Sequence, residues 1–167
     1  MAHPNVFPVV AVLVLATMLL DGCGFRPRGT LNLPEDVRNV YIQAPGAVAD
    51  EIQIFLDGEK VNIMPGPADA DVTIAVTSER YDKRVTAVDP STGKEREFEI
   101  VYTVYYNVIR DNGAIIVPPK ELKFRRDYVF DPATVLGDTN EEQVLREEMR
   151  SDAAYAIVRG LEAALAR

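Results

Sequence analysis

The chain has 167 residues, of which 47% are hydrophobic, so it is long enough for one compact domain with its own core. Its formal net charge of −8 argues against general binding of nucleic acid, whose phosphates attract basic proteins. The sequence has one histidine, His3, and one cysteine, Cys23, which excludes an internal disulfide and zinc sites built from several thiolates or imidazoles.

The N-terminal segment has the pattern of a lipoprotein export signal. Residues 9–20 form an apolar run interrupted only by Thr17, too short to span a bilayer but of the length of a signal core. The run ends in Leu20-Asp21-Gly22-Cys23 and resembles the lipobox of bacterial lipoproteins, although Asp21 stands where a small neutral residue is usual and residues 1–8 lack Lys and Arg. The alternative is an amphiphilic first helix with a buried free cysteine, but this run is not amphipathic.

This resemblance implies a domain organisation. Residues 1–22 would be the signal peptide, Cys23 the acylated lipid anchor, residues 23–34 an extended tether, and residues 35–167 a single α/β domain. Gly24 is not the Asp that commonly retains lipoproteins in the inner membrane, so the outer membrane is the expected location. The mature chain would then have no histidine and no free thiol, which excludes Ser-His-Asp and Cys-His catalysis. We therefore expect no catalytic residues, no metal site and no cofactor.

The first half of the domain begins with a strand and a helix. Residues 39–43 alternate as a short strand. Val48, Ile52, Phe55 and Leu56 recur at helical spacing, and Gly58 is a C-terminal stop. From residue 71 the period changes to two, which predicts a strand that extends to residue 88.

The second half predicts two more strands and a long helix. Residues 89–93 form a turn, and residues 97–110 form a strand with Phe98, Ile100, Tyr102, Val104, Tyr106 and Val108 on one face. A further strand is expected from about residue 122 to 130. Thr139 and Glu142 form a capping box at the start of the last helix. Its apolar stripe comprises Leu145, Met149, Ala153, Ile157, Leu161 and Leu165.

The element order is therefore β-α-β-β-β-α. The first βα unit requires a crossover and the remaining strands form a meander closed by a helix. The predicted fold is an α/β (α+β) two-layer sandwich, with a four-stranded mixed sheet and two helices on one face.

Residues 23–30, Cys-Gly-Phe-Arg-Pro-Arg-Gly-Thr, resemble the mature start of the LptE family of LPS-assembly lipoproteins, with Pro27 in place of an aliphatic residue. The element order also matches that family. The resemblance implies a partner, an LptD-type outer-membrane β-barrel that the domain plugs and helps to assemble, and a role in delivering lipopolysaccharide to the cell surface. The domain would lie inside or beneath the barrel on the periplasmic side. Alternatives are another outer-membrane adaptor, such as an auxiliary lipoprotein of a lipid-transport ABC system, and an envelope hydrolase.

Basic side chains are the candidates for contact with lipopolysaccharide, which presents phosphates and carboxylates. The family resemblance implies one near the hairpin turn and one in the first turns of the last helix. Lys94 and Arg146 match these positions best, and Arg84 or Arg96 is an alternative to Lys94, so the candidates are Lys94, Arg96 and Arg146. Each charge taken singly is more simply explained as a residue that keeps a strand edge soluble.

Overall fold

The computed structural model describes residues 31–57, 59, 61–130 and 135–166, and for residues 135–140 it describes the helix backbone only. The chain divides into two units, residues 1–30 and 31–167, and all the described residues belong to the second unit. The predicted signal peptide and Cys23 therefore lie outside the described residues.

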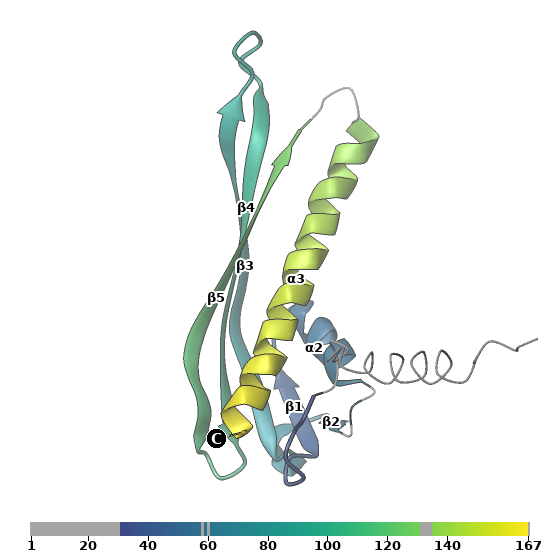
Figure 1. The fold of residues 1–167 in the computed structure, drawn as a ribbon, viewed down its shortest axis with the longest axis vertical. Coiled ribbons are helices and arrows are strands. Elements are labelled where there is room, and N and C mark those ends of the chain that lie inside the picture. The colour runs from purple at the N-terminus through teal and green to yellow at the C-terminus, as the bar shows by residue number, and fades with distance from the viewer. Residues whose placement is uncertain (1–30, 58, 60, 131–134, 167) are drawn as a thin grey trace, which may run out of the picture. The chain divides into compact units, whose positions relative to one another are not determined.

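The second unit contains one mixed sheet (Figure 1). Its strands are β1 (Asn39–Gln43), β2 (Asn62–Met64), β3 (Val72–Val88), β4 (Glu95–Arg110) and β5 (Ile115–Val129), in the spatial order β2-β1-β3-β4-β5. β1 pairs in parallel with β2 and β3, whereas β3, β4 and β5 form an antiparallel meander. The predicted crossover after the first strand and the predicted meander are both present.

The sheet has five strands, and the prediction of four was wrong. The additional strand is β2, in which Asn62, Ile63 and Met64 pair with Asn39, Val40 and Tyr41. Three residues are too few to show a period of two, and β2 forms through contacts with β1 instead of through its own pattern. β5 also begins at Ile115, earlier than expected, because an edge strand tolerates Pro118 and Pro119, which lack a donor for the ladder.

Two helices pack on one face of the sheet, as predicted (Figure 1). They are α2 (Val48–Leu56) and α3 (Val135–Leu165), and a short 3₁₀ turn, η1 (Pro67–Asp69), precedes β3. The tilted ring pair of Phe55 and Tyr155, with centroids 5.7 Å apart, joins the two helices. The predicted capping box at Thr139 is wrong, because α3 already begins at Val135 and Thr139 lies inside the helix.

The core lies between the helices and the sheet and contains the predicted stripes. Phe98, Ile100, Tyr102, Val104, Tyr106 and Val108 of β4 are all buried, as are Met149, Ala153, Ile157 and Leu161 of α3. Each buried stripe follows the period of its own element, two on the strand and about four on the helix. The close approach of α3 to the sheet depends on Gly160, because a Cβ there would lie 2.6 Å from the hydroxyl of Tyr106.

Within the described ranges, no helix combines the length and the apolar character needed to cross a membrane.

Candidate functional site

The tip of the β3–β4 hairpin carries two of the predicted ligand-binding residues, Lys94 in the turn and Arg96 as the second residue of β4. This turn extends past the end of β5 (Figure 1), and both side chains are exposed. Asp89 orders the turn, since its Oδ1 accepts hydrogen bonds from the backbone N–H groups of Ser91 (2.9 Å) and Thr92 (2.8 Å) and from their hydroxyls. These bonds lower the pKa of Asp89 to about 2, so the carboxylate is ionised and holds the turn at neutral pH.

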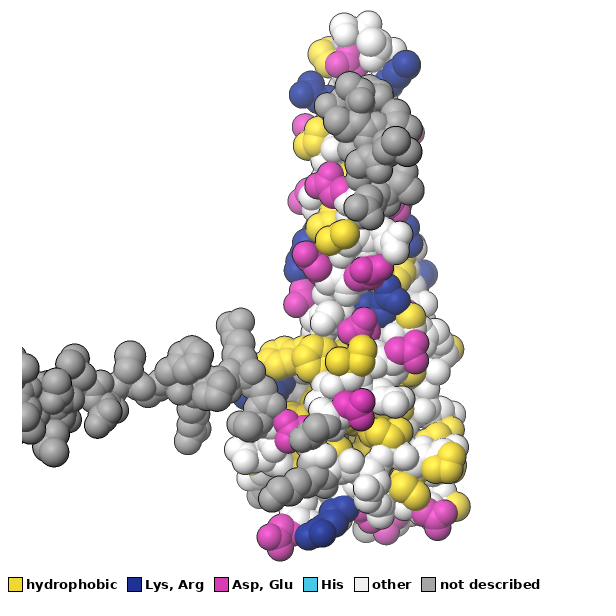
Figure 2. Space-filling model, turned by 90° about the vertical axis from the view of Figure 1, so that its right-hand side faces the viewer, with side chains coloured by type: hydrophobic (Ala, Val, Ile, Leu, Met, Phe, Trp, Pro, Cys, Tyr) yellow, Lys and Arg dark blue, Asp and Glu magenta, His cyan; other side chains and the backbone are white. Residues whose placement is uncertain are grey.

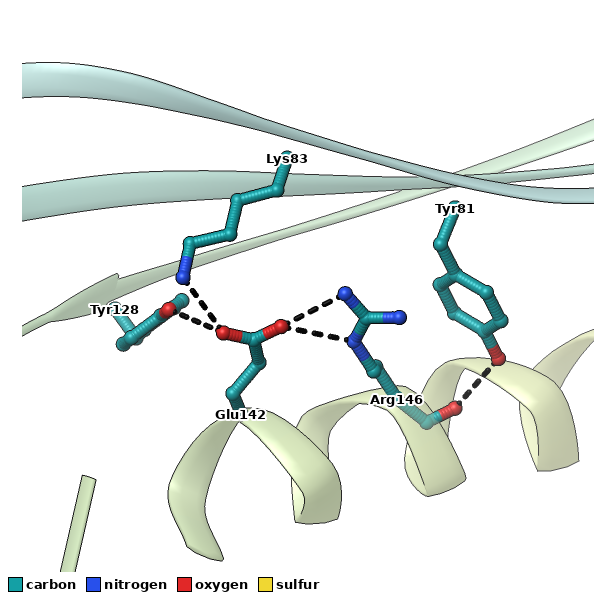
Figure 3. A network of polar contacts seen from close by, with 5 residues as sticks. All are labelled: Tyr81, Lys83, Tyr128, Glu142 and Arg146. Atoms are coloured by element: carbon teal, nitrogen blue, oxygen red, sulfur yellow. Dashed lines mark hydrogen bonds and ion pairs between the residues drawn. The ribbon is translucent and has the colours of Figure 1, made fainter. Parts of the chain in front are cut away.

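Arg146, the third predicted residue, lies on α3 within a polar network that reaches the sheet (Figure 3). Its Nε and Nη2 donate to Oε1 of Glu142, at 3.0 and 2.7 Å. The guanidinium also lies 4.9 Å from the ring centroid of Tyr81, whose hydroxyl donates to the backbone carbonyl of Arg146 at 2.9 Å. The position of Arg146 is therefore fixed on both sides, by a carboxylate and by an aromatic face.

Glu142 is the centre of this network. Its second oxygen, Oε2, accepts from the ammonium of Lys83 at 2.7 Å and from the hydroxyl of Tyr128 at 2.6 Å. Partial burial alone would raise the pKa of Glu142, but the hydrogen bonds from Lys83, Tyr128 and Arg146 outweigh that effect and lower it to about 2. A carboxyl that is ionised at neutral pH has no proton to donate there, so Glu142 acts in this network as a hydrogen-bond acceptor and as the counter-ion of Lys83 and Arg146.

Lys83 belongs to the network because of an irregularity in β3. Its ammonium lies 4.1 Å from the ring centroid of Phe98 as well as against Glu142. If the alternation of Val72, Ile74 and Val76 continued, Lys83 would lie on the opposite face. The register shift between Val76 and Ser78 moves the alternation by one residue and turns Lys83 toward α3.

The predicted residues therefore occupy two separate places. Arg146 contacts Tyr81, whereas Lys94 and Arg96 follow Val88 at the far end of the hairpin. The seven intervals between successive residues from Tyr81 to Val88 span roughly 23 Å at about 3.3 Å each. The basic side chain that shares Glu142 with Arg146 is Lys83, and the bulge that places it there leaves no clear signal in the sequence.

The other basic side chains are divided between the two faces of the sheet. Arg126 faces the helices and donates to Asp152 of α3 at 2.6 Å. Arg84 lies on the opposite face, where it forms an ion pair with Glu99 at 2.5 Å. Within the described part of the chain, no group of three or more His, Cys, Asp or Glu side chains could hold a metal ion.

Comparison with known proteins identifies the family. The model of the family described as "LptE: Lipopolysaccharide-assembly" matches residues 36–161, which include the whole sheet and most of α3. The chain belongs to the LptE family. The family assignment that residues 23–30 suggested is confirmed by this match to residues 36–161.

Curated relatives in the LptE family extend over most of the chain. The LPS-assembly lipoprotein LptE of Photorhabdus laumondii is 28% identical over 154 residues, which cover 90% of this chain and 82% of the relative. The protein of the same name from Yersinia enterocolitica is 29% identical over 159 residues, covering 92% of this chain and 74% of the relative.

Solved structures share the fold. The solution structure of an uncharacterized lipoprotein B from Nitrosomonas europaea has a TM-score of 0.69 and 28% identity, and the match covers 84% of this chain and 91% of that one. The crystal structure of the rare lipoprotein B from Shewanella oneidensis has a TM-score of 0.62 at 21% identity, covering 75% of this chain and 95% of that one. These matches agree with the mixed sheet and two helices described above.

Proposed function

We propose that this chain is an outer-membrane lipoprotein that binds an LptD-type β-barrel, assists its assembly and helps to deliver lipopolysaccharide to the cell surface. The observation that carries this proposal is the LptE family match over residues 36–161, together with relatives named LPS-assembly lipoprotein over about 90% of the chain. The function is one of binding and assembly, with no catalytic step.

The surface supports a partner that buries part of this domain. Figure 2 shows hydrophobic side chains gathered toward the wider end of the unit, while acidic and basic side chains intermix along its narrow end. Several large hydrophobic side chains are exposed, among them Ile54 and Ile115 at 62% each, Val88 at 54% and Val129 at 52%. A barrel that covers such side chains would stabilise the domain through shared burial.

The anchor in this proposal is Cys23. Acylation of its thiol would attach the chain to the periplasmic side of the outer membrane, with a tether that ends at residue 31, where the second unit begins. The acyl chains contribute hydrophobic binding energy, and a barrel partner would add a second attachment.

Lys94 and Arg96 are the candidates for contact with the anionic groups of lipopolysaccharide. Both are exposed, Lys94 on the turn that Asp89 holds in shape and Arg96 at the start of β4, and neither forms a side-chain ion pair within 4 Å among the described residues. Arg146 is the third candidate, but a ligand anion there would have to compete with Glu142.

Co-purification from the native envelope tests the main proposal. The tagged full chain is cross-linked in cells, solubilised with detergent and purified, and the bound proteins are identified by mass spectrometry. We expect a large outer-membrane β-barrel of the LptD type in an approximately equimolar amount, and a reduced yield of it from Cys23→Ala. Enrichment of an inner-membrane transporter in place of the barrel would contradict the proposal and favour an ABC-type lipid-transport adaptor.

A further inference from the structure

The face of the sheet opposite the helices contains a groove lined mainly by basic side chains. Three strands contribute to it, and its volume is about 240 Å³. The lining residues are Arg80, Asp82, Arg84, Val101, Thr103, Lys123 and Arg125. This groove is distinct from the network around Glu142, which lies on the helix side, and from the turn that carries Lys94.

Strand register places Thr103 at the centre of the groove. Thr103 of β4 is directly opposite Arg80 of β3 on one side and Lys123 of β5 on the other. In the next row, Val101 lies between Asp82 and Arg125. Since residues opposite one another across strands have Cβ atoms about 5 Å apart, the basic side chains of both neighbouring strands can reach a group held above Thr103.

The hydroxyl of Thr103 is buried and has no partner. The residue is only 2% exposed, and no hydrogen-bond partner of its Oγ1 occurs in the described part of the chain. A buried hydroxyl without a hydrogen bond costs free energy, so such a group calls for an explanation. A ligand acceptor in the groove would satisfy it.

The cations around Thr103 retain free hydrogen-bonding capacity. The ion pair of Arg125 with Glu99 is as long as 4.0 Å, and Arg80 uses its Nε for Asp82 at 2.9 Å. Lys123 contacts Glu121 at 3.0 Å, which leaves further N–H groups of its ammonium available. Four basic side chains and Asp82 line the groove, and Glu99 and Glu121 pair with three of these cations, so the cations exceed the carboxylates by one although the chain as a whole is acidic.

We propose that this groove is an anion site that takes a phosphate group. The Thr103 hydroxyl would donate to one phosphate oxygen at the floor of the groove, while Arg80, Lys123 and Arg125 donate to the others. A phosphate monoester has several acceptor oxygens and up to two negative charges, which matches one hydroxyl and several cations better than a singly charged carboxylate does. The groove has room for a phosphate group, because its volume of about 240 Å³ is several times the roughly 30 Å³ that one water molecule occupies in the liquid. The phosphate belongs either to a lipid headgroup or to a soluble compound.

Titration of the full chain in nonionic detergent with inorganic phosphate tests the site. We expect saturable shifts of backbone amide NMR signals at Thr103 and at its neighbours in register, Arg80 and Lys123, and weaker binding as the NaCl concentration rises. Thr103→Val keeps the shape of the side chain and removes the hydroxyl, and it should weaken phosphate binding about tenfold. The variant should fold, because it removes only an unpartnered polar atom.

A matched pair of substitutions on β5 provides the control. Arg125→Gln should weaken phosphate binding severalfold, whereas Arg126→Gln, at the next residue, should leave it unchanged because Arg126 faces Asp152 on the helix side. An equal effect of the two substitutions, shifts centred away from Thr103, or no saturable binding would overturn the proposal. Acetate binding as tight as phosphate would overturn the assignment to phosphate.

A second arm distinguishes the two sources of the phosphate. Micelles of the same detergent that contain phosphatidic acid are compared with micelles that contain phosphatidylcholine. If micelles with phosphatidic acid displace inorganic phosphate and micelles with phosphatidylcholine do not, the site binds a lipid headgroup. If inorganic phosphate binds and neither lipid displaces it, the ligand is a soluble compound. Neither result depends on a barrel partner, so this experiment can succeed or fail independently of the proposed role in lipopolysaccharide assembly.

Discussion

The ammonium of Lys83 lies 2.7 Å from Oε2 of Glu142 and joins the middle of β3 to the first half of α3 (Figure 3). Glu142 also accepts from Arg146 and Tyr128, so one carboxylate neutralises two cations that face each other between a helix and a sheet. Burial alone would lower the pKa of Lys83, but its hydrogen bonds to Glu142 and Tyr128 raise it above the usual value. The pair therefore remains charged throughout the neutral range.

Glu142→Gln should destabilise the domain. The substitution leaves Lys83 and Arg146 close together without their shared carboxylate, and we expect a loss of about 2–3 kcal/mol in the free energy of unfolding, as for other charge-assisted hydrogen bonds. Urea denaturation measures this loss. Glu141→Gln, at the exposed preceding residue, is the matched control and should change the value little. Equal effects of the two substitutions would mean that the network does not contribute to stability.

The contribution of Glu142 should also depend on pH in a defined direction. Its pKa is about 2 in the folded chain and near the ordinary 4.5 in the unfolded chain, so the unfolded state takes up the proton first as the pH falls. The stability that Glu142 provides is therefore complete above about pH 5 and is lost as the pH falls toward 2. The difference in unfolding free energy between the wild type and Glu142→Gln should shrink over that range. Asp89 is present in both proteins, so its own titration cancels.

Gly160→Ala should destabilise the domain, although alanine is the better helix former by about 1 kcal/mol. The new Cβ would lie 2.6 Å from the buried hydroxyl of Tyr106, and overpacking of this kind costs about 1–3 kcal/mol. We expect a net loss of up to about 2 kcal/mol, measured by chemical denaturation.

Tyr106→Phe provides the control for the Gly160 prediction. No hydrogen-bond partner of the Tyr106 hydroxyl occurs among the described residues, so its removal alone should cost little. The next nearest atom to the new Cβ, Cζ of Tyr106, is 3.7 Å away, which is an ordinary contact. Gly160→Ala should therefore be neutral or stabilising in the Tyr106→Phe background. A full loss in both backgrounds would place the strain elsewhere.

The parts of the fold that were predicted from sequence are elements with one buried face whose hydrophobic pattern repeats over many residues. β4 alternates through Tyr102 and Tyr106, and α3 carries Met149 and Leu161 on one stripe, so burial and sequence pattern coincide. β2 was missed because its three residues form a strand only through pairing with β1, which is a non-local property.

The candidate site was predictable only in part, because a bulge decides which face each side chain takes. Basic residues in β3 could be found from sequence, but the shift between Val76 and Ser78 turns Lys83 toward α3 and Arg84 toward the opposite face. The role of Glu142 was also misjudged, because α3 begins before Thr139 and the carboxylate contacts the sheet instead of capping the helix.

Cys23→Ala should abolish lipid attachment. Cys23 is the only thiol in the chain, so no other residue can accept the diacylglycerol. Growth in radiolabelled palmitate should label the wild type and not the variant, which we expect to be unprocessed or released into the periplasm. Asp21→Ala, which brings a small neutral residue into the lipobox, should keep the label. Equal labelling of wild type and Cys23→Ala would contradict the anchor.

Charge reversal at the hairpin turn should weaken lipopolysaccharide binding without unfolding the domain. Lys94→Asp combined with Arg96→Asp alters two exposed side chains at the tip of the hairpin, where substitutions cost little stability. Arg146→Asp is measured separately, because it would add a second carboxylate beside Glu142 and so destabilise the network itself. Binding of purified lipopolysaccharide to the full chain is measured at low salt, where ionic attraction is least screened.

The matched control for the turn is Arg38→Asp combined with Lys120→Asp, which changes the net charge equally. Lys120 lies opposite Tyr106, far along the hairpin from Lys94, and Arg38 directly precedes β1. If the turn receives the lipid, only the Lys94 and Arg96 pair should lower affinity, and wild-type affinity should fall as screening shortens toward about 3 Å at 1 M salt. Binding driven by acyl chains would persist at high salt and respond to neither pair. Equal losses from both pairs would show that net charge, and not the turn, governs the attraction.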